Sequence, residues 1–346
     1  GDSLYIMEYR LAASGDTLHK RVEHVNYIIG SGQHTNSHLY DINGYLYQAP
    51  ITFYTQSKKW DLAPGFDGGH NTRFNRIIAK ECMTCHNGMP KMVEGSVNKF
   101  THLPEGINCE RCHGPGELHV KEKLAGNIVD TSKGPDYTIV NPGRLSKELQ
   151  MSVCQRCHLQ GIAVLQEGKD FDDFKPGMHL NEVMQVFLPE YHQAEDKFIM
   201  ASQAQRLRKS KCYNLTEMTC VTCHNPHVSV KETPISVFNT ACENCHSSSA
   251  DAVAANVFCT EAESARMAVD NNCSGCHMPR SGSIDIPHVN ITDHYIRTDY
   301  SSSITSVTQE EIKQLEAFAG LHCLTDEQPE ALEVAKGYLS FYEKFS

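Results

Sequence analysis

The stretch Thr219-Cys220-Val-Thr-Cys223-His224-Asn-Pro-His227 carries the pattern that decides the fold of this chain. Two cysteines lie three positions apart, and a histidine follows the second cysteine directly. This Cys-x-x-Cys-His pattern occurs six times in 346 residues. In chain order, the six motifs consist of Cys82, Cys85 and His86; Cys109, Cys112 and His113; Cys154, Cys157 and His158; Cys220, Cys223 and His224; Cys242, Cys245 and His246; and Cys273, Cys276 and His277. They are numbered motifs 1 to 6 below.

The spacing of each motif suits covalent attachment of haem c. Two thiols on one turn of chain reach the two vinyl groups of a porphyrin and form thioethers, and the next imidazole binds the iron as proximal ligand. Zinc sites and thioredoxin-like redox pairs also use Cys-x-x-Cys. Neither these sites nor a disulfide framework needs a histidine directly after the second cysteine of each pair. Because only 19 of the 346 residues are His, six such placements are not expected by chance. The motifs therefore predict six covalently bound haem c groups.

The composition indicates what fills the interior. Residues of the AVILMFWYC group make up 40% of the chain, and this count includes 15 cysteines. Few side chains remain for an apolar core of ordinary richness, so porphyrins are expected to supply much of it. The predicted fold class is a multihaem cytochrome c. We expect mainly short α-helices and irregular loops wrapped around stacked haems, with a small N-terminal antiparallel β region.

The motifs and the patterns between them divide the chain into five segments. Strand-like runs and the turn signals Ser14-Gly-Asp and Asn43-Gly44 predict a β-rich N-terminal region. Periodic patterns predict one helix over 198–208, a second that begins with Thr308 as N-cap and includes Phe318, and a third that opens at Pro329 and carries Leu332 and Leu339. The predicted segments are a β-rich region at 1–75, a three-haem segment at 76–165, a helical connector at 166–211, a three-haem segment at 212–300 and a helical hairpin at 301–346.

The second axial ligands have to come from the 13 histidines outside the motifs. An electron-transfer haem usually has both axial positions filled, whereas an enzyme haem leaves one open. His119 and His227 follow motifs 2 and 4 so closely that each is expected to reach the iron of a neighbouring haem. The predicted distal ligands are His34, His119, His227, His288 and His294. The sixth is left open among His38, His70, His102, His179 and His192, a partner protein, an upstream segment, or no ligand at all.

Three cysteines lie outside the motifs: Cys212, Cys259 and Cys323. An odd number permits at most one internal disulfide, for which Cys212 with Cys259 is the candidate. Three buried free thiols are an equally good interpretation.

The chain resembles a family at the residues quoted next. They are Ile29-Gly-Ser-Gly-Gln-His34-Thr-Asn-Ser, Cys109-Glu-Arg-Cys112-His113-Gly-Pro-Gly-Glu-Leu-His119, Ser210-Lys-Cys-Tyr before motif 4, and Cys276-His277-Met-Pro before Asp285-Ile-Pro-His288. The pattern resembles multihaem cytochromes with doubled Cys-x-x-Cys-His motifs, related to the tetrahaem cytochrome of ammonia oxidisers. The resemblance covers roughly residues 25–300 and implies axial roles for the matching histidines. Members often carry a further haem motif upstream, so a processed or partial chain is expected.

The mode of haem attachment, the net charge and the hydropathy of the chain indicate where the protein is found and what it binds. Haem is attached in this way after export, so we expect a periplasmic or extracellular protein. The formal net charge of −11 argues against nucleic acid as a partner and favours redox partner proteins, such as other cytochromes, with basic docking patches. No stretch reaches the roughly 18 apolar residues of a membrane-spanning helix.

Three functions fit this pattern. The leading hypothesis is an electron carrier with mostly bis-His haems, which makes catalysis less expected. The second is an oxidoreductase that acts on a small nitrogen or sulfur compound at a five-coordinate haem. The Cys-x-x-Cys-Lys variant typical of pentahaem nitrite reductases does not occur, which makes the second hypothesis less favoured than the first. The third is self-assembly into an oligomer or an extracellular cytochrome filament.

Overall fold

The computed structural model describes residues 3–66, 71–192, 202–247, 258–283, 285–298 and 318–345. The chain forms two compact units. Unit 1 consists of Gly1–Arg111 with Asp285–Val289, and unit 2 consists of Cys112–Ile284 with Asn290–Ser346. The division falls inside motif 2, between Arg111 and Cys112.

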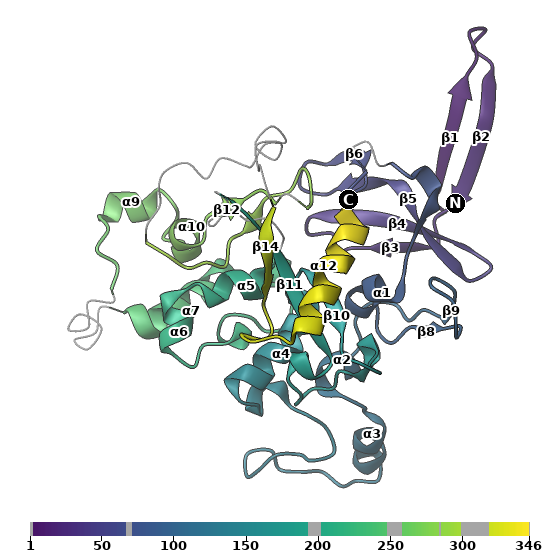
Figure 1. The fold of residues 1–346 in the computed structure, drawn as a ribbon. Helices are drawn as coiled ribbons and strands as arrows, with labels where there is room; N and C mark the ends of the chain where they lie inside the picture. The colour runs from purple at the N-terminus through teal and green to yellow at the C-terminus, as the bar shows by residue number, and fades with distance from the viewer. Residues whose placement is uncertain are drawn as a thin grey trace. The chain divides into compact units, whose positions relative to one another are not determined.

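Unit 1 begins with a long antiparallel hairpin, visible in Figure 1 as the purple pair of strands. Strands β1 (Tyr5–Leu11) and β2 (Thr17–His24) pair so that Met7 lies opposite Val22. The Ala12 amide donates to the Asp16 carbonyl and the Gly15 amide donates to the Ala12 carbonyl, which closes the turn at the predicted Ser14-Gly-Asp site. Much of the hairpin's apolar surface is exposed, including Tyr5, Met7 and Leu11.

The body of unit 1 is a five-stranded antiparallel sheet. Its strand order is β3-β4-β5-β6, and β7 pairs with β5. The strands are β3 (Tyr27–Ile29), β4 (Thr35–Ile42), β5 (Tyr45–Tyr54), β6 (Lys59–Leu62) and β7 (Arg76–Ile77). Asn43 and Gly44 both have positive φ, 55° and 87°, which gives the β4–β5 hairpin the tight turn that this dipeptide favours. The predicted N-terminal antiparallel β region is therefore confirmed.

Helix α1 (Lys80–His86) is held to this sheet by a small apolar core. Met83 is buried with Leu39, Leu46 and Phe100. Burial of one such side chain stabilises the fold by about 1.5–3 kcal/mol. A second hairpin, β8 (Lys91–Met92) with β9 (Phe100–His102), completes the unit.

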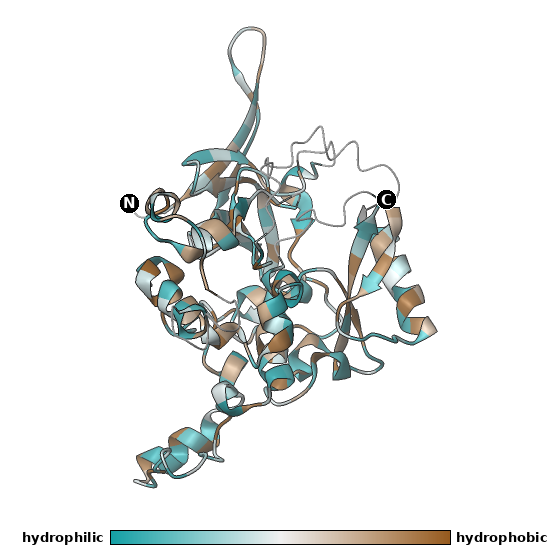
Figure 2. Ribbon diagram, turned by 90° about the vertical axis from the view of Figure 1, so that its left-hand side faces the viewer, coloured by the Kyte–Doolittle hydropathy of each residue, from teal (hydrophilic) through white to brown (hydrophobic). Residues whose placement is uncertain are grey.

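Unit 2 contains a second antiparallel sheet and one long helix. The sheet order is β10-β11-β14, from Ile162–Leu165, Met184–Tyr191 and Phe318–Cys323. Helix α12 (Ala331–Phe345) packs on it through Val334 and Phe341, and Gly337 lets the Phe187 ring approach closely. Apolar and polar residues mix along this helix (Figure 2).

The rest of unit 2 is made of short helices, two-residue strands and loops. The helices are α2 (Glu110–His113), which crosses the division between the units, α3 (Glu117–Leu124), α4 (Lys147–His158), α5 (Gln203–Arg208), α6 (Lys211–Leu215), α7 (Ile235–His246), α9 (Glu263–Met267) and α10 (Cys273–His277). Strands β12 (Arg280–Ser281) and β13 (Ile291–Thr292) form a small ladder.

The structure corrects several sequence-based expectations. Strands are more prominent than the mainly helical prediction allowed, so that part of the fold class is only partly right. The predicted helical connector contains strand β11, and Phe318 begins strand β14 instead of lying on a helix. Helix α5 is part of the helix predicted at 198–208, whose residues 198–201 lie outside the described ranges. Residues 308–317 of the predicted first C-terminal helix also lie outside them.

Helix α12 confirms a helix after Pro329, but with a different packing face. Leu332 and Leu339 are 61% and 59% exposed, whereas Val334 and Phe341 contact the sheet. Among the described helices, all are too short or too polar to cross a bilayer.

Candidate haem-binding sites

All six motifs lie in described residues, and five of them end a helix with their histidine. Helices α1, α2, α4, α7 and α10 end at His86, His113, His158, His246 and His277. Motif 4 instead forms a single 3₁₀ turn at Cys220–Thr222. A helical turn places the two cysteines on one side of the chain and ends where the imidazole has to project, which is what haem c attachment needs.

Residues in the motif helices and at their N-termini anchor the motifs. In α1, Met83 and Thr84 are buried while Cys82 is exposed. In α4, Ser146 caps the helix by accepting from the Leu149 amide, and Met151 and Val153 enter the core of unit 2. Core packing therefore leaves the thiols of these helices at the surface or half-buried.

None of the motif cysteines forms a disulfide in the structure. The predicted Cys212–Cys259 disulfide is absent, because both of these cysteines are free as well. Cys323 is the one buried thiol of the fifteen, and it contacts the side chain of Gln185. The alternative of three free thiols is therefore supported, although only Cys323 is buried.

Several histidines direct one ring nitrogen at a backbone carbonyl. The Nδ1 atom of His113 lies 2.8 Å from the Val140 oxygen, and that of His277 lies 3.0 Å from the Arg297 oxygen. The Nδ1 atom of His294 lies 3.0 Å from the Thr292 oxygen. A carbonyl can only accept, so Nδ1 carries the proton and Nε2 keeps its lone pair. Metal-ligating histidines commonly donate their other ring N–H to a carbonyl in this way, which fixes the tautomer and the ring orientation.

Two pairs of histidines face each other within unit 2. The ring centroids of His113 and His227 are 5.9 Å apart with planes 15° from parallel. Those of His224 and His294 are 6.1 Å apart with planes 27° from parallel. A metal–nitrogen bond is about 2 Å and a ring centroid lies roughly 1 Å behind its nitrogen, so two axial imidazoles on one ion lie about 6 Å apart. The residues present therefore fit one iron between each pair.

The protonation states suit ligation. Burial is the main cause that lowers the pKa of His294, to about 4, and burial also lowers the pKa values of His224 and His158. These rings are neutral at pH 7, which is the form that binds a metal.

The other predicted distal ligands have different surroundings. The Nδ1 atom of His119 lies 3.0 Å from the Thr138 hydroxyl and 3.4 Å from an Asp136 carboxylate oxygen. In unit 1, His34 contacts the Gln56 amide at 2.7 Å. The Nε2 atom of His288 lies 3.0 Å from Asp61, so that nitrogen is engaged by a carboxylate in the structure.

Of the candidates for the sixth ligand, His38 is a buried sheet residue stacked on Trp60 with centroids 5.0 Å apart. His102 and His192 are exposed, and the His179 amide donates to Glu182 at 2.7 Å. His70 lies outside the described residues. The structure therefore singles out no sixth ligand.

Contacts between motifs were not predicted from the sequence. The thiols of Cys154 in motif 3 and Cys220 in motif 4 lie close enough to shift each other's pKa, and burial together with the nearby Cys273 of motif 6 raises the pKa of Cys242 in motif 5. Asn239 ties the second pair together: its Oδ1 accepts from the Cys273 amide at 3.1 Å, and its Nδ2 donates to the Asn271 carbonyl at 2.9 Å. No sequence signal identifies such pairs, because the spacing of the motifs along the chain is irregular.

Six haem-attachment motifs and facing imidazole pairs define a multihaem c-type cytochrome. Comparison with known proteins supports this class. Residues 64–114, which include motifs 1 and 2, match the family described as cytochrome c554 and c-prime. The chain is 27% identical over 190 residues to multiheme cytochrome MtrA of Shewanella baltica (strain OS185). That alignment covers 49% of this chain and 52% of MtrA, so the chain spans about half the length of the curated relative it matches.

A solved structure, that of the outer cell wall cytochrome OcwA, aligns with 71% of this chain and 55% of its own chain. The sequence identity is 15% and the TM-score is 0.35. Values this low do not define a common fold.

Proposed function

We propose that this chain conducts electrons along six covalently bound haem c groups, most of them with two histidine ligands. The observation that carries the proposal is the presence of two histidine pairs, His113 with His227 and His224 with His294, each at the spacing of two axial ligands. An iron with both axial positions filled suits electron transfer and leaves no site for a substrate. Haem iron supplies the one-electron redox chemistry, and the chain's residues attach, ligate and space the groups.

The ligand assignments belong to the proposal. His113 and His227 are the axial ligands at motif 2, and His224 and His294 are those at motif 4. His34, His119 and His288 serve the remaining motifs, and the sixth distal ligand stays open. His288 has to release Asp61 before its Nε2 can bind iron.

Close spacing of the groups is supported by the chain itself. His224 and His227 are three residues apart but serve motifs 4 and 2, so the corresponding irons have to be neighbours. The Cys154–Cys220 contact brings motif 3 to motif 4, and the Cys242–Cys273 contact brings motif 5 to motif 6. Electrons can therefore pass between the groups of unit 2 without large movements of the chain.

We place this activity in the periplasm or outside the cell, where haem c proteins mature and where thioether-bound cofactors persist. The partners are redox proteins, other cytochromes among them, and the net charge of −11 favours partners with basic docking surfaces. A close relation to the tetrahaem cytochrome of ammonia oxidisers remains part of the same proposal.

Electron paramagnetic resonance of the oxidised, haem-loaded protein tests the electron-carrier function. We expect low-spin signals that account for at least five of the six irons, together with a reversible redox titration. A high-spin signal that changes when nitrite, hydroxylamine or tetrathionate is added would instead support an oxidoreductase. Nickel-affinity-free purification avoids an added histidine tag that could itself bind iron.

Self-assembly is a second candidate because of the β1–β2 hairpin. Tyr5, Met7 and Leu11 are each about half exposed on one strand, 58%, 51% and 57%, which is unusual for a monomer surface. Electron microscopy at rising protein concentration distinguishes the outcomes. Filaments that disappear in a Tyr5→Ser/Met7→Ser variant would support assembly through the hairpin, and single particles at every concentration would exclude it.

A further inference from the structure

The segment Thr292–Arg297 of unit 2 serves two motifs at once. His294 faces His224 of motif 4. Three residues later, the Arg297 carbonyl accepts from Nδ1 of His277, the histidine of motif 6, and the Arg297 amide donates to the His277 carbonyl at 3.2 Å. A displacement of this segment would therefore disturb a distal ligand of one iron and the proximal ligand of another.

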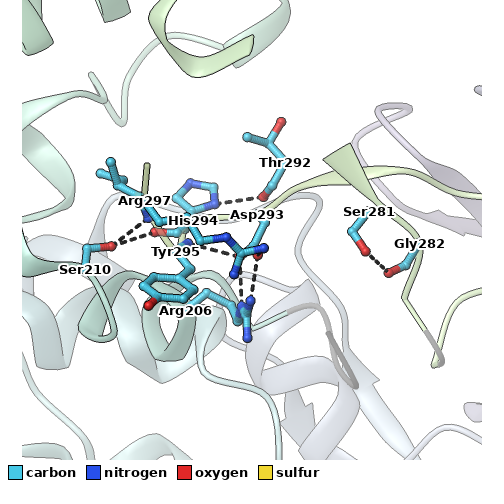
Figure 3. Close-up of polar contacts among 10 residues, drawn as sticks. Arg206, Ser210, Ser281, Gly282, Thr292, Asp293, His294, Tyr295 and Arg297 are labelled. Atoms are coloured by element: carbon cyan, nitrogen blue, oxygen red, sulfur yellow. Dashed lines mark hydrogen bonds and ion pairs between the residues drawn. The ribbon is translucent and has the colours of Figure 1, made fainter. Parts of the chain in front are cut away.

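A buried ion pair fixes the segment from α5. The Arg206 guanidinium donates two hydrogen bonds to the Asp293 carboxylate, at 2.8 and 2.6 Å, and both side chains are only 2% exposed (Figure 3). Asp293 also accepts from the Tyr295 amide at 3.0 Å, which fixes the backbone on the far side of His294. Such a bidentate arrangement sets orientation as well as distance.

Ser210, which is fully buried, adds a second point of attachment. Its hydroxyl donates to the His294 carbonyl at 3.2 Å and accepts from the Ile296 amide at 2.8 Å (Figure 3). The backbone of the ligand residue is thus held on both sides by groups that do not themselves touch the iron position.

We propose that the Arg206–Asp293 ion pair is a positioning device that holds His294 over the motif 4 iron and the Arg297 carbonyl against His277. The inference rests on the proposed function, in which His224 and His294 are axial ligands. A buried ion pair contributes little to stability compared with apolar residues of similar volume, so a positional role explains this pair better than stabilisation does.

The test compares variants that remove the Arg206–Asp293 ion pair in different ways. An Arg206→Met single variant leaves the buried Asp293 carboxylate with only the longer Arg297 ion pair, at 3.9 Å, and can fail to fold. The double variant Arg206→Met/Asp293→Leu replaces the whole pair by apolar side chains, which often preserves stability. Asp293→Asn keeps the acceptor for the Tyr295 amide and removes the charge. Arg208→Met is the matched control, because Arg208 lies in the same helix and donates to the Leu324 carbonyl.

The measurement is carbon monoxide binding to the reduced, haem-loaded chain, with the oxidised spin state as a second readout. We expect one additional binding equivalent per chain in the double variant, and association about 10-fold faster or more in Asp293→Asn, with Arg208→Met unchanged. Wild-type binding in both folded variants would overturn the inference, as would an equal effect of Arg208→Met. If the double variant does not fold, Asp293→Asn alone decides the outcome in the same way.

A His294→Gly variant separates this inference from the proposed function. If His294→Gly opens one carbon monoxide site but the ion-pair variants do not, only the positioning role fails. If His294→Gly changes neither ligand binding nor spin state, His294 is not an axial ligand and the proposed ligation at motif 4 fails with it.

Discussion

The imidazole rings of His113 and His227 lie 5.9 Å apart between centroids and 15° from parallel, although 114 positions separate the two residues in the sequence. His113 is anchored through Nδ1 to the Val140 carbonyl, which leaves the lone pair of Nε2 available for a metal. This relationship joins motif 2 to the segment that follows motif 4, and it supplies a direct prediction.

Replacement of His227 by Gly should leave the motif 2 iron with one histidine ligand. We expect one of six haems to become high-spin, seen by electron paramagnetic resonance, without loss of covalent haem. His19→Asn is the control, because His19 is an exposed residue of β2 with a positive φ of 50° that Asn also adopts. A fully low-spin spectrum in His227→Gly would show that another residue ligates this iron.

The role of His227 could be predicted from the sequence only in part. Its short distance from motif 4 predicts that it ligates a neighbouring haem, but only the tertiary structure indicates which one. Pairing across more than 100 residues depends on packing in unit 2, for which the motif spacing carries no signal.

Strand β11 was not predicted from the sequence. Residues 166–211 are predicted to form a helical connector, but Pro189 of that segment lies within β11. β10 pairs only with Met184–Phe187, whereas Pro189 lies opposite Leu321 of β14, so its missing N–H removes no hydrogen bond to β10. The six motifs, the N-terminal hairpins and the last helix were predictable because each rests on a local pattern.

The Asp136 carboxylate beside His119 should tune one redox potential. Hydrogen bonds from Lys123 and then Thr138 lower the pKa of Asp136, so it is ionised at neutral pH and places a negative charge 3.4 Å from Nδ1 of His119. We expect Asp136→Asn to raise the midpoint potential of one haem in a spectroelectrochemical titration. Asp130→Asn, in the same exposed loop, should leave the titration unchanged. Superimposable curves for Asp136→Asn and wild type would argue against His119 as a ligand.

The two hydrogen bonds of Asn239 should stabilise the contact between α7 and motif 6. Asn239→Ala removes both and is expected to reduce the free energy of unfolding by about 1–3 kcal/mol. Asn239→Asp retains the acceptor for the Cys273 amide, so its loss should be smaller. Denaturant unfolding of the loaded protein measures both values. Equal stability of Asn239→Ala and wild type would contradict the bridging role.

His38 should make unit 1 sensitive to mild acid. Burial lowers the pKa of His38, despite the opposing hydrogen bond to the Ile51 carbonyl, whereas the unfolded chain has a pKa of about 6.5. Between these two values the unfolded state binds more protons, so stability rises with pH. The stabilisation is complete above about pH 6.5 and is lost as the pH falls through the folded pKa.

Denaturant midpoints between pH 5 and 7 measure this dependence. We expect His38→Gln to flatten the slope and the exposed control His24→Gln to retain it. An unchanged slope in His38→Gln would assign the acid sensitivity to other groups.

Intact mass spectrometry of the native material under denaturing conditions tests the central claim most directly, because only covalently attached groups survive. The account predicts the polypeptide mass plus six haems, with all twelve motif cysteines unreactive toward thiol reagents. A bare polypeptide mass near 38.7 kDa, with zinc in place of iron in the native sample, would contradict it.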